Sequence, residues 1–223
     1  MPVSRETSNS GGPWRADLKS ILTESSPHLS DQVVGKLSLF ANEILNENEL
    51  LHLVSQRDPK SEIIKQIVDS AAITNCLSLC PGCRVLDVGS GAGFPGIVLK
   101  LIFPGVKLYT LDSSPRKIDF QRRVCAKLEI SATFLNCDFR QAALDELVDI
   151  VLVKALGSKR DVIRKSRNWL RSCGKLIFME GRTPDPIIES SVSQLDAFSH
   201  HVLIPYRLAA FESVRHLAVV YKK

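Results

Sequence analysis

The segment VLDVGSGAGFPGIVLKLIFPGVKLYTLDSSPRK (Val85–Lys117) contains two apolar runs that each lead to an aspartate, with a glycine-rich loop between them. Short apolar runs of this kind predict buried parallel strands, and the stretch between them predicts a helix. The same alternation continues toward the end of the chain, which indicates a largely parallel sheet with helices on both faces. Ligands of such sheets bind at the carboxyl ends of the strands, so the glycine loop predicts a nucleotide site at that edge.

The chain divides into a helical part and a strand–helix part. From about Trp14 to Thr74 apolar residues recur at three- and four-residue steps, with helix starts predicted at Ser30–Asp31 and Asp58–Pro59. Strands are predicted at Arg84–Val88, Lys107–Leu111, Ala132–Asn136, Ile150–Val153, Lys175–Met179, His201–Pro205 and His216–Tyr221. We therefore expect an α/β, Rossmann-like, doubly wound sheet of seven mostly parallel strands. The expected parts are a flexible N-terminus (1–15), an N-terminal helical extension (16–80) and a ligand-binding domain (81–223).

Length and composition fit one α/β domain with an extension, since the chain has 223 residues and a formal net charge of +5. No apolar run approaches the roughly 20 residues that span a bilayer, and the N-terminus lacks the apolar core of a signal peptide. We therefore expect a cytoplasmic protein that does not bind membranes and whose six cysteines are reduced. Cys80 and Cys83 have the spacing of redox or zinc pairs, but no second pair accompanies them. We interpret them as small buried residues and expect no metal.

The glycine loop has the features of a nucleoside site. Gly89, Gly91 and Gly93 allow a sharp turn and a close approach of the backbone to a ligand, although a plain tight turn is the simpler alternative. Asp112 ends the second strand 23 residues after Gly89, where a carboxylate can accept hydrogen bonds from ribose hydroxyls or, alternatively, cap the next helix. This arrangement suits either a dinucleotide or S-adenosylmethionine.

Three further residues favour S-adenosylmethionine. Phe94 follows the glycines directly, where a dinucleotide site would have small residues, and we expect it to form an apolar wall of the pocket. Asp87 stands beside the first glycine, at the place where motif I of the class I methyltransferases has its acid. Asp138 follows the third strand, where this fold holds adenine, although a helix cap is an equal alternative.

The sequence resembles the ribosomal small-subunit methyltransferase G family over nearly the whole chain from about residue 35. The resemblance rests on "LDVGSGAGFPGIVL" and "LDSSPRKIDF", and extends to "NENELLHLVSQRDPKSEIIKQIVDS" and to the closing "ESVRHLAVVYKK". In the helical segment the matching residues are Asn48, Asp58, Pro59, Lys65, Asp69 and Ser70, and near the end they are Arg215 and His216. The resemblance implies a class I, S-adenosylmethionine-dependent methyltransferase that methylates guanine N7 in a 16S rRNA loop near the decoding site.

The resemblance also assigns residues to the site. The implied cofactor-binding residues are Asp87, Gly89, Gly91, Gly93, Phe94, Asp112, Asp138, Phe139 and Arg140, and the implied catalytic residue is Lys154. Guanine N7 carries a lone pair and no proton, so the transfer needs no general base. Catalysis would come from holding N7 in line with the methyl group and the leaving sulfur.

Two basic segments follow two different strands and could form one phosphate-attracting face. The expected RNA-binding residues are Arg116, Lys117, Arg122, Arg123, Lys159, Arg160 and Arg182. The alternative is that these charges are solvated helix faces. The expected partner is 16S rRNA, in the small ribosomal subunit or an assembly intermediate, and nothing indicates an obligate interface, so we expect a monomer.

The chain departs from the family pattern near the expected transfer site. Lys154 stands where the family usually has an arginine, and lysine lacks the planar fork of the guanidinium group. Glu180 stands where the family usually has a lysine, and the neighbouring Arg182 could compensate its charge. Three alternatives therefore stay open: a methyltransferase of this fold acting on another RNA position, a non-catalytic RNA-binding or assembly factor, and an NAD-dependent oxidoreductase. The intact loop argues against the second, and the Phe-Pro after the glycines argues against the third.

Overall fold

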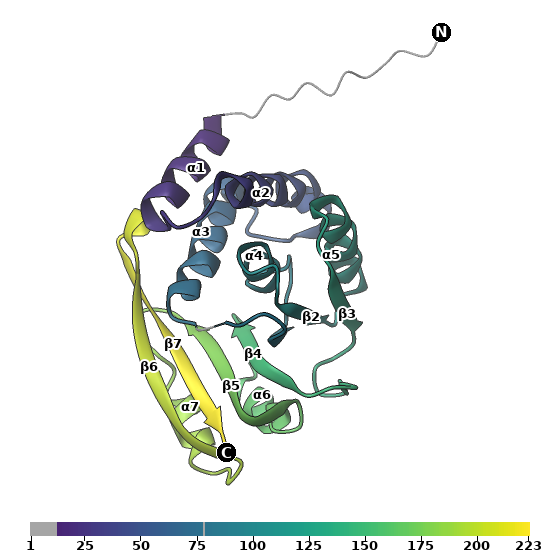
Figure 1. The fold of residues 1–223 in the computed structure, drawn as a ribbon, viewed down its shortest axis with the longest axis vertical. Coiled ribbons are helices and arrows are strands. Elements are labelled where there is room, and N and C mark those ends of the chain that lie inside the picture. Colours follow the sequence, from purple (N-terminus) through teal and green to yellow (C-terminus); the bar gives the residue numbers. More distant parts are fainter. Residues whose placement is uncertain (1–12, 78) are drawn as a thin grey trace.

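The computed structural model describes residues 13–77 and 79–223, and a seven-stranded sheet in the order β3-β2-β1-β4-β5-β7-β6 runs through it (Figure 1). The strands are β1 (Arg84–Val88), β2 (Lys107–Asp112), β3 (Ala132–Asn136), β4 (Val148–Lys154), β5 (Leu170–Glu180), β6 (Phe198–Leu208) and β7 (Ser213–Lys222). Strands β1 to β5 are parallel, and β7 is antiparallel to both β5 and β6. The strand order reverses between β1 and β4, so the glycine loop after β1 lies at the switch point where such sheets bind ligands.

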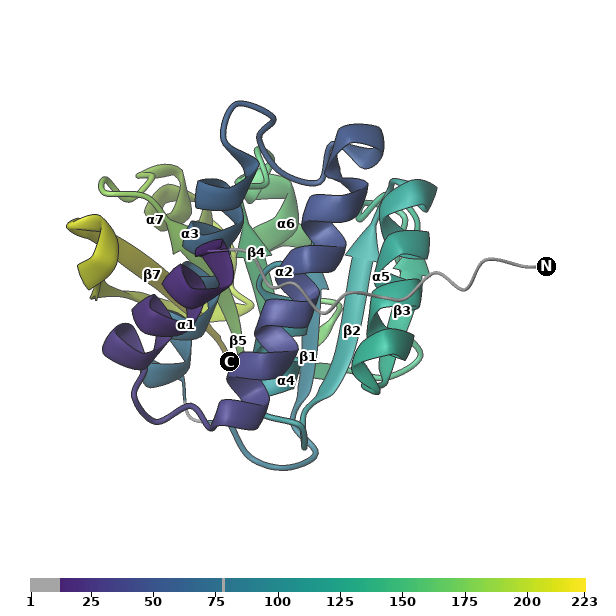
Figure 2. The same ribbon diagram turned by 90° about the horizontal axis from the view of Figure 1, so that it is seen from above.

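Helices cover both faces of the sheet, as Figures 1 and 2 show, with α1 to α5 on one side and α6 and α7 on the other. Their bounds are α1 (Pro13–Ser25), α2 (Asp31–Leu51), α3 (Pro59–Ala72), α4 (Gly96–Ile102), α5 (Pro115–Leu128), α6 (Lys159–Ser166) and α7 (Ile187–Val192). Short 3₁₀ turns occupy Ile73–Asn75 and Ala209–Phe211. None of the helices within residues 13–77 and 79–223 has the length and apolarity required to cross a bilayer.

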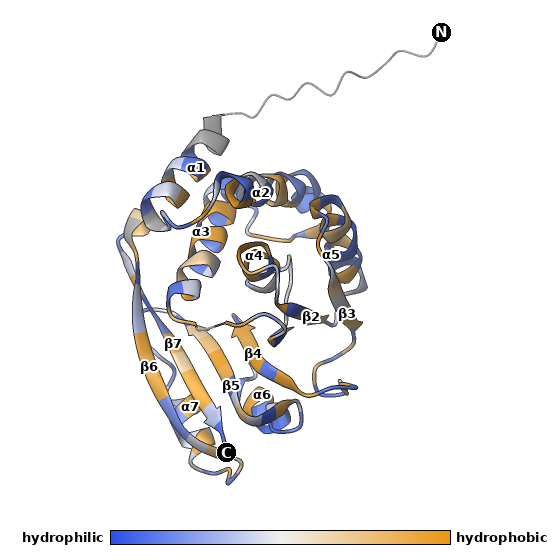
Figure 3. Cartoon of the chain, viewed as in Figure 1, coloured by the Kyte–Doolittle hydropathy of each residue, from blue (hydrophilic) through white to orange (hydrophobic). Residues whose placement is uncertain are grey.

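Two apolar cores lie on the two faces of the sheet, because successive residues of a strand point to opposite sides. In β4, Ile150 and Leu152 belong to the core under α1 to α5, whereas Val151 and Val153 belong to the core under α6 and α7. The first core also contains Leu18 and other apolar residues of α1 to α3, so the helical extension and the sheet share one core. Figure 3 shows mainly apolar residues along β4 and β5 and a mixture of apolar and hydrophilic residues along the helices.

The predicted α/β architecture and both predicted helix starts are confirmed. Helix α2 begins at Asp31 after Ser30, whose Oγ accepts a hydrogen bond from the Val33 amide at 3.3 Å. Helix α3 begins at Pro59 after Asp58, whose carboxylate accepts one from the Ser61 amide at 3.2 Å.

The last strands are longer than the sequence pattern predicts. Strands β6 and β7 pair from Phe198↔Lys222 to Leu208↔Ser213, and β6 is lengthened by this hairpin although much of it is exposed. Most of the predicted polar lead-in, residues 1–12, lies outside the described residues, and α1 begins at Pro13.

Candidate functional site

The glycine loop after β1 has a backbone that only glycine adopts readily. Gly89, Gly91 and Gly93 have φ angles of 72°, 56° and 102°. The Gly89 amide donates to the carbonyl of Leu111 in β2 at 2.8 Å, which fixes the start of the loop. A Cβ atom at Gly93 would lie 2.4 Å from Cδ1 of Ile97, so a side chain there has no room. The shape of the loop therefore depends on backbone conformations that glycine allows.

Asp87 lies beneath this loop and is completely buried. Its Oδ2 accepts a hydrogen bond from the Gly96 amide at 2.8 Å, and its Oδ1 has no hydrogen-bond partner within the described part of the chain. Burial raises the pKa of this carboxyl to about 8, which the Gly96 amide and the nearby Lys154 only partly oppose. A Cβ at Gly96 would come within 2.7 Å of Oδ2, so Gly96, which the sequence analysis did not single out, is required for this contact.

Asp112 and Gln121 tie the loop to β2 and α5. Oδ2 of Asp112 accepts from the Gly91 amide and Oδ1 accepts from the Ser114 amide, both at 2.9 Å. The buried Gln121 donates from Nε2 to the Gly91 carbonyl at 2.8 Å and to Ser90 Oγ at 2.9 Å. Sequence reasoning missed Gln121, although its position between apolar residues on a basic helix is a signal for a buried polar role.

A cavity of about 390 Å³ opens beside this loop at the carboxyl ends of β1, β2 and β3; we call it the glycine-loop cavity. It is lined by Gly89, Gly91, Leu111, Asp112, Ser113, Lys117, Asp138, Phe139, Arg140, Ala155, Leu156 and Ser158. Six of the nine predicted cofactor residues are among them, whereas Asp87, Gly93 and Phe94 are not. Lys117, predicted as an RNA-binding residue, also lines it. The volume is in the range of small-molecule sites.

The turn after β3 forms one wall of the glycine-loop cavity. The Arg140 guanidinium lies 4.6 Å from the centre of the Phe139 ring and forms ion pairs with Asp138 at 3.3 Å and with Asp161 of α6 at 3.4 Å. Asp138 also accepts from the Arg140 amide at 2.8 Å. The Asp138 carboxylate therefore stabilises a local turn. This arrangement agrees better with the capping alternative than with a carboxylate that is free to bind a ligand.

A second cavity of about 300 Å³ lies at the carboxyl ends of β4 and β5; we call it the charged cavity. It is lined by Lys65, Gln66, Asp69, Lys154, Ala155, Lys159, Met179, Glu180, Gly181 and Arg215. Ala155 lines both cavities, so they meet at the end of β4.

Lys154 takes part in a buried network in the charged cavity. Its Nζ lies 2.8 Å from Oδ2 of Asp69, and the Tyr206 hydroxyl donates to Oδ1 of the same carboxylate at 2.8 Å. The ammonium also lies 5.8 Å from the centre of the Phe94 ring, which packs against Phe40 of α2. Burial lowers the Lys154 pKa, and Asp69 opposes this shift. In the sequence Asp69 appeared only as a match to the family pattern, and Tyr206, 137 positions away, carried no signal at all.

The charge of Glu180 is compensated by Lys159. Lys159 Nζ lies 2.7 Å from Oε2 of Glu180 and 3.1 Å from Oδ2 of Asp185. These hydrogen bonds outweigh the effect of burial and raise the Lys159 pKa. Arg182, which the sequence analysis considered as the compensating charge, is exposed and forms no ion pair with any described residue.

The other basic residues fall into two groups. Arg123 pairs with Glu47 of α2 at 2.5 Å, and Arg122 lies 5.0 Å from the centre of the Phe134 ring. These side chains support the packing of α5, as the solvated-face interpretation implies. Arg116 and Arg160 are exposed and have no ion pair among the described residues.

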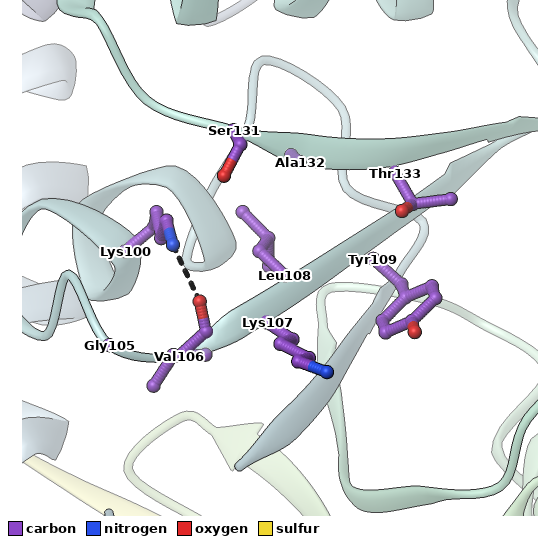
Figure 4. Close-up of a pocket in the computed structure, with 9 residues that line it drawn as sticks. All are labelled: Lys100, Gly105, Val106, Lys107, Leu108, Tyr109, Ser131, Ala132 and Thr133. Atoms are coloured by element: carbon purple, nitrogen blue, oxygen red, sulfur yellow. Dashed lines mark hydrogen bonds between the residues drawn. The ribbon is translucent and has the colours of Figure 1, made fainter. Parts of the chain in front are cut away.

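A third cavity, of about 280 Å³, lies at the opposite edge of the sheet near the amino ends of β2 and β3 (Figure 4). Its buried Lys100 donates to the Val106 carbonyl at 2.6 Å and to the Pro104 carbonyl at 2.7 Å. The ammonium therefore stabilises the turn before β2, and the charged groups that could act on a ligand gather instead at the carboxyl edge.

Comparison of the sequence with known proteins gives one consistent family. A family model described as rRNA small subunit methyltransferase G matches residues 34–217. The ribosomal RNA small subunit methyltransferase G of Acinetobacter baylyi is 27% identical over 213 residues, which cover 93% of this chain and 97% of that protein. The protein of the same name from Desulfitobacterium hafniense is 40% identical over 103 residues, which cover 46% of this chain and 42% of that protein.

Solved structures with a similar fold include a methyltransferase. A methyltransferase from Pyrococcus furiosus superposes with a TM-score of 0.58 at 14% identity, covering 83% of this chain and 96% of that chain. TrmN from Thermus thermophilus superposes with a TM-score of 0.55 at 18% identity, covering 73% of this chain and 54% of that chain. The likeness confirms the class I methyltransferase fold predicted from the sequence.

Proposed function

Because the chain belongs to the rRNA small subunit methyltransferase G family, we propose that it transfers a methyl group from S-adenosylmethionine to N7 of a guanine in 16S rRNA. The family and the fold use S-adenosylmethionine as the methyl donor, which supplies an electrophilic methyl group on a sulfonium sulfur. The observation that carries the proposal is the glycine loop, fixed at the switch point beside a cavity with an acidic residue at the end of β2.

The residues of the glycine-loop cavity fit this cofactor. Asp112 lines the cavity and retains lone pairs for ribose hydroxyls, and the backbone of Gly89 and Gly91 can approach a ligand closely. Phe139, covered on one side by Arg140, offers an apolar surface near an adenine ring. Asp87, with one oxygen free of hydrogen bonds and a raised pKa, would ionise most readily beside a positively charged group.

The remaining residues would position the acceptor base. Guanine N7 has an available lone pair, so no side chain has to remove a proton, and alignment alone can contribute roughly 7–11 kcal/mol to lowering the barrier. Lys154 stands where the two cavities meet and is held rigidly by Asp69, which suits a residue that fixes the orientation of the base.

Basic residues around the two cavities would hold the RNA backbone. Arg116, Arg160 and Arg182 are exposed, and Lys117 lines the glycine-loop cavity, so these four are the strongest candidates. Arg122, Arg123 and Lys159 contact other parts of the protein and would contribute less. We propose the small ribosomal subunit or an assembly intermediate as the substrate, a monomeric enzyme, and the cytoplasm as its compartment.

A methyltransferase acting on another rRNA position is the second candidate. The observation that favours it is the charged cavity itself, where Lys154 and Glu180 replace the arginine and the lysine of the family pattern and Glu180 pairs with Lys159.

Labelled S-adenosylmethionine and small subunits from a strain that lacks the N7 mark test the proposal. Methyl incorporation is measured and the modified nucleotide is located by mass spectrometry. Incorporation at a single guanine N7 supports the first candidate, and incorporation elsewhere supports the second. Binding of the cofactor without any incorporation into rRNA would contradict both.

A further inference from the structure

We propose that the charged cavity receives the acceptor guanine, with its Watson–Crick edge against Glu180 and its N7 side toward Lys154 and the glycine loop. This inference rests on the proposed function and adds to it the residue that distinguishes guanine from other bases. It follows from the arrangement of charges in the cavity, from the free oxygen of Glu180 and from the chemistry of the two edges of guanine.

Two buried ion pairs of the charged cavity lie at the ends of neighbouring strands. Lys154 ends β4, the strand next to β1 and its glycine loop, and its ammonium lies 5.8 Å from the ring centre of Phe94 in that loop. Glu180 ends β5, one strand farther from the loop, and Lys154 is in register with Met179, the residue before it. A base in this cavity would therefore meet the Lys154–Asp69 ion pair on the side of the glycine loop and the Glu180–Lys159 ion pair on the far side.

The Glu180 carboxylate is fixed and still has an acceptor to offer. Only about 5% of its side chain is exposed, and Oε2 accepts from Lys159 Nζ at 2.7 Å and from the Asp185 amide at 3.2 Å. Its Oε1 has no hydrogen-bond donor among the residues that the structure describes. By contrast, both oxygens of Asp69 are engaged, by Lys154 and by Tyr206. Glu180 is thus the carboxylate in this cavity that can receive a ligand's N–H groups.

Guanine matches this arrangement better than other bases do. Its Watson–Crick edge carries two neighbouring donors, N1–H and the 2-amino group, which the two lone pairs of Oε1 of Glu180 can accept, while O6 and N7 on the other edge are acceptors. Lys154 Nζ uses Asp69 and, more weakly at 3.5 Å, Ser70, which leaves a proton for O6. Adenine presents a lone pair at N1, which a carboxylate would repel, and hypoxanthine lacks the 2-amino group.

Binding of mononucleotides to the full chain, saturated with S-adenosylhomocysteine, tests the inference. We expect GMP to bind roughly 10-fold tighter than IMP, because one hydrogen bond to a charged acceptor is lost, and AMP to bind more weakly still. In Glu180→Gln the side-chain NH₂ group would point at the N–H groups of guanine, so donor would meet donor. The affinity for GMP should therefore fall to the affinity for IMP. Glu189→Gln, an exposed glutamate of α7, is the matched control and should keep the wild-type order. The same E180Q variant should raise KM for unmethylated subunits without altering affinity for S-adenosylhomocysteine.

The outcomes separate this inference from the proposed function. An unchanged GMP-to-IMP ratio in E180Q, no preference of the wild type for GMP over AMP, or no GMP binding at millimolar concentration would each overturn the inference. If E180Q does not fold, Glu180→Asp keeps the charge and withdraws the oxygen, and it should also reduce the ratio; an unchanged ratio then overturns the inference. If the wild-type protein methylates guanine N7 and E180Q keeps the full preference for GMP over IMP, only the role of Glu180 is refuted. Absence of methyl transfer to rRNA would refute the proposed function, whatever nucleotide binding shows.

Discussion

The two cavities at the carboxyl edge are adjacent but are formed in different ways. The glycine-loop cavity is formed by one continuous part of the chain, from β1 to the turn after β3, with a few residues after β4, and backbone geometry gives it its shape. The charged cavity is formed by side chains from α3, β4, α6, β5 and β7, which are far apart in the sequence. Its shape depends on ion pairs such as Lys154 with Asp69.

This difference predicts different sensitivities. A cavity shaped by backbone geometry should fail when a side chain is added to its loop. A cavity held by buried ion pairs should fail when one member of a pair is removed, because the remaining charge is left buried without its counter-charge. The predictions below test this contrast, beginning with the largest expected effect.

Gly93→Ala should reduce affinity for S-adenosylmethionine by at least about 30-fold. The new Cβ would lie 2.4 Å from Ile97 Cδ1 at a φ of 102°, and the strain and the clash each cost about 1–3 kcal/mol. Gly82→Ala is the control, since Gly82 also has a positive φ of 84° but no atom within 4 Å of the added Cβ. It should leave the affinity unchanged. Isothermal titration of both variants measures the effect, and a change below 3-fold in G93A would contradict a loop set by backbone geometry.

Lys154→Met should lower the free energy of unfolding by about 3–5 kcal/mol and abolish methyl transfer. The side chains of Lys154 and Asp69 are only 11% and 8% exposed, so the variant leaves a carboxylate buried with the Tyr206 hydroxyl alone. Lys127→Met removes a similar contact, at 2.6 Å to Glu43, but on the surface, and should cost at most about 1 kcal/mol.

The free energies of unfolding of these variants are measured by urea denaturation. A double variant distinguishes the effect of the unpaired charge from the effect of lost packing. Asp69→Asn combined with K154M removes both charges, so it should recover part of the lost stability without recovering activity. Equal losses in K154M and K127M would show that the charged cavity is not held by its buried ion pair.

Asp87→Asn should remove a pH dependence of stability. The folded state holds the Asp87 proton up to about pH 8, whereas the unfolded state loses it near the ordinary value of 3.8. Between these values the folded state binds more protons, so stability falls as pH rises, and the variant should lack this contribution. Denaturation at pH 5, 6.5 and 8 measures the difference between the two proteins. If the difference in stability between D87N and the wild type is the same at all three pH values, Asp87 is ionised in the free protein.

Arg160→Ala should weaken binding of 16S rRNA and reduce the salt dependence of the binding constant by about one phosphate contact. Arg160 is exposed, without an ion pair among the described residues, at the start of α6 next to Lys159 of the charged cavity. Arg123→Ala should have a smaller effect, because Arg123 already pairs with Glu47. RNA binding is measured at several salt concentrations, and the slopes of the binding constant against salt are compared between the variants. A larger effect of R123A would indicate that the RNA contacts α5 and not α6.

The contrast also explains what could be predicted from the sequence. The strands β1 and β3, the glycine loop and the position of Asp112 at the end of β2 were predictable, since local spacing sets them. Gln121 was missed because its hydrogen bonds to the loop depend on how α5 packs. Asp69 with Tyr206, and Glu180 with Lys159, meet only through tertiary packing, so no local pattern in the sequence could identify them as pairs.

A crystal structure of the chain with S-adenosylhomocysteine and GMP would test the central claim most directly. We predict that the thioether sulfur lies at the end of β4 beside Ala155, where the cavities meet, with guanine N7 facing it from the charged cavity. The Watson–Crick edge should contact Oε1 of Glu180. A purine bound outside the charged cavity, or one whose N7 points away from the sulfur, would contradict the account of two cavities that form one path for methyl transfer.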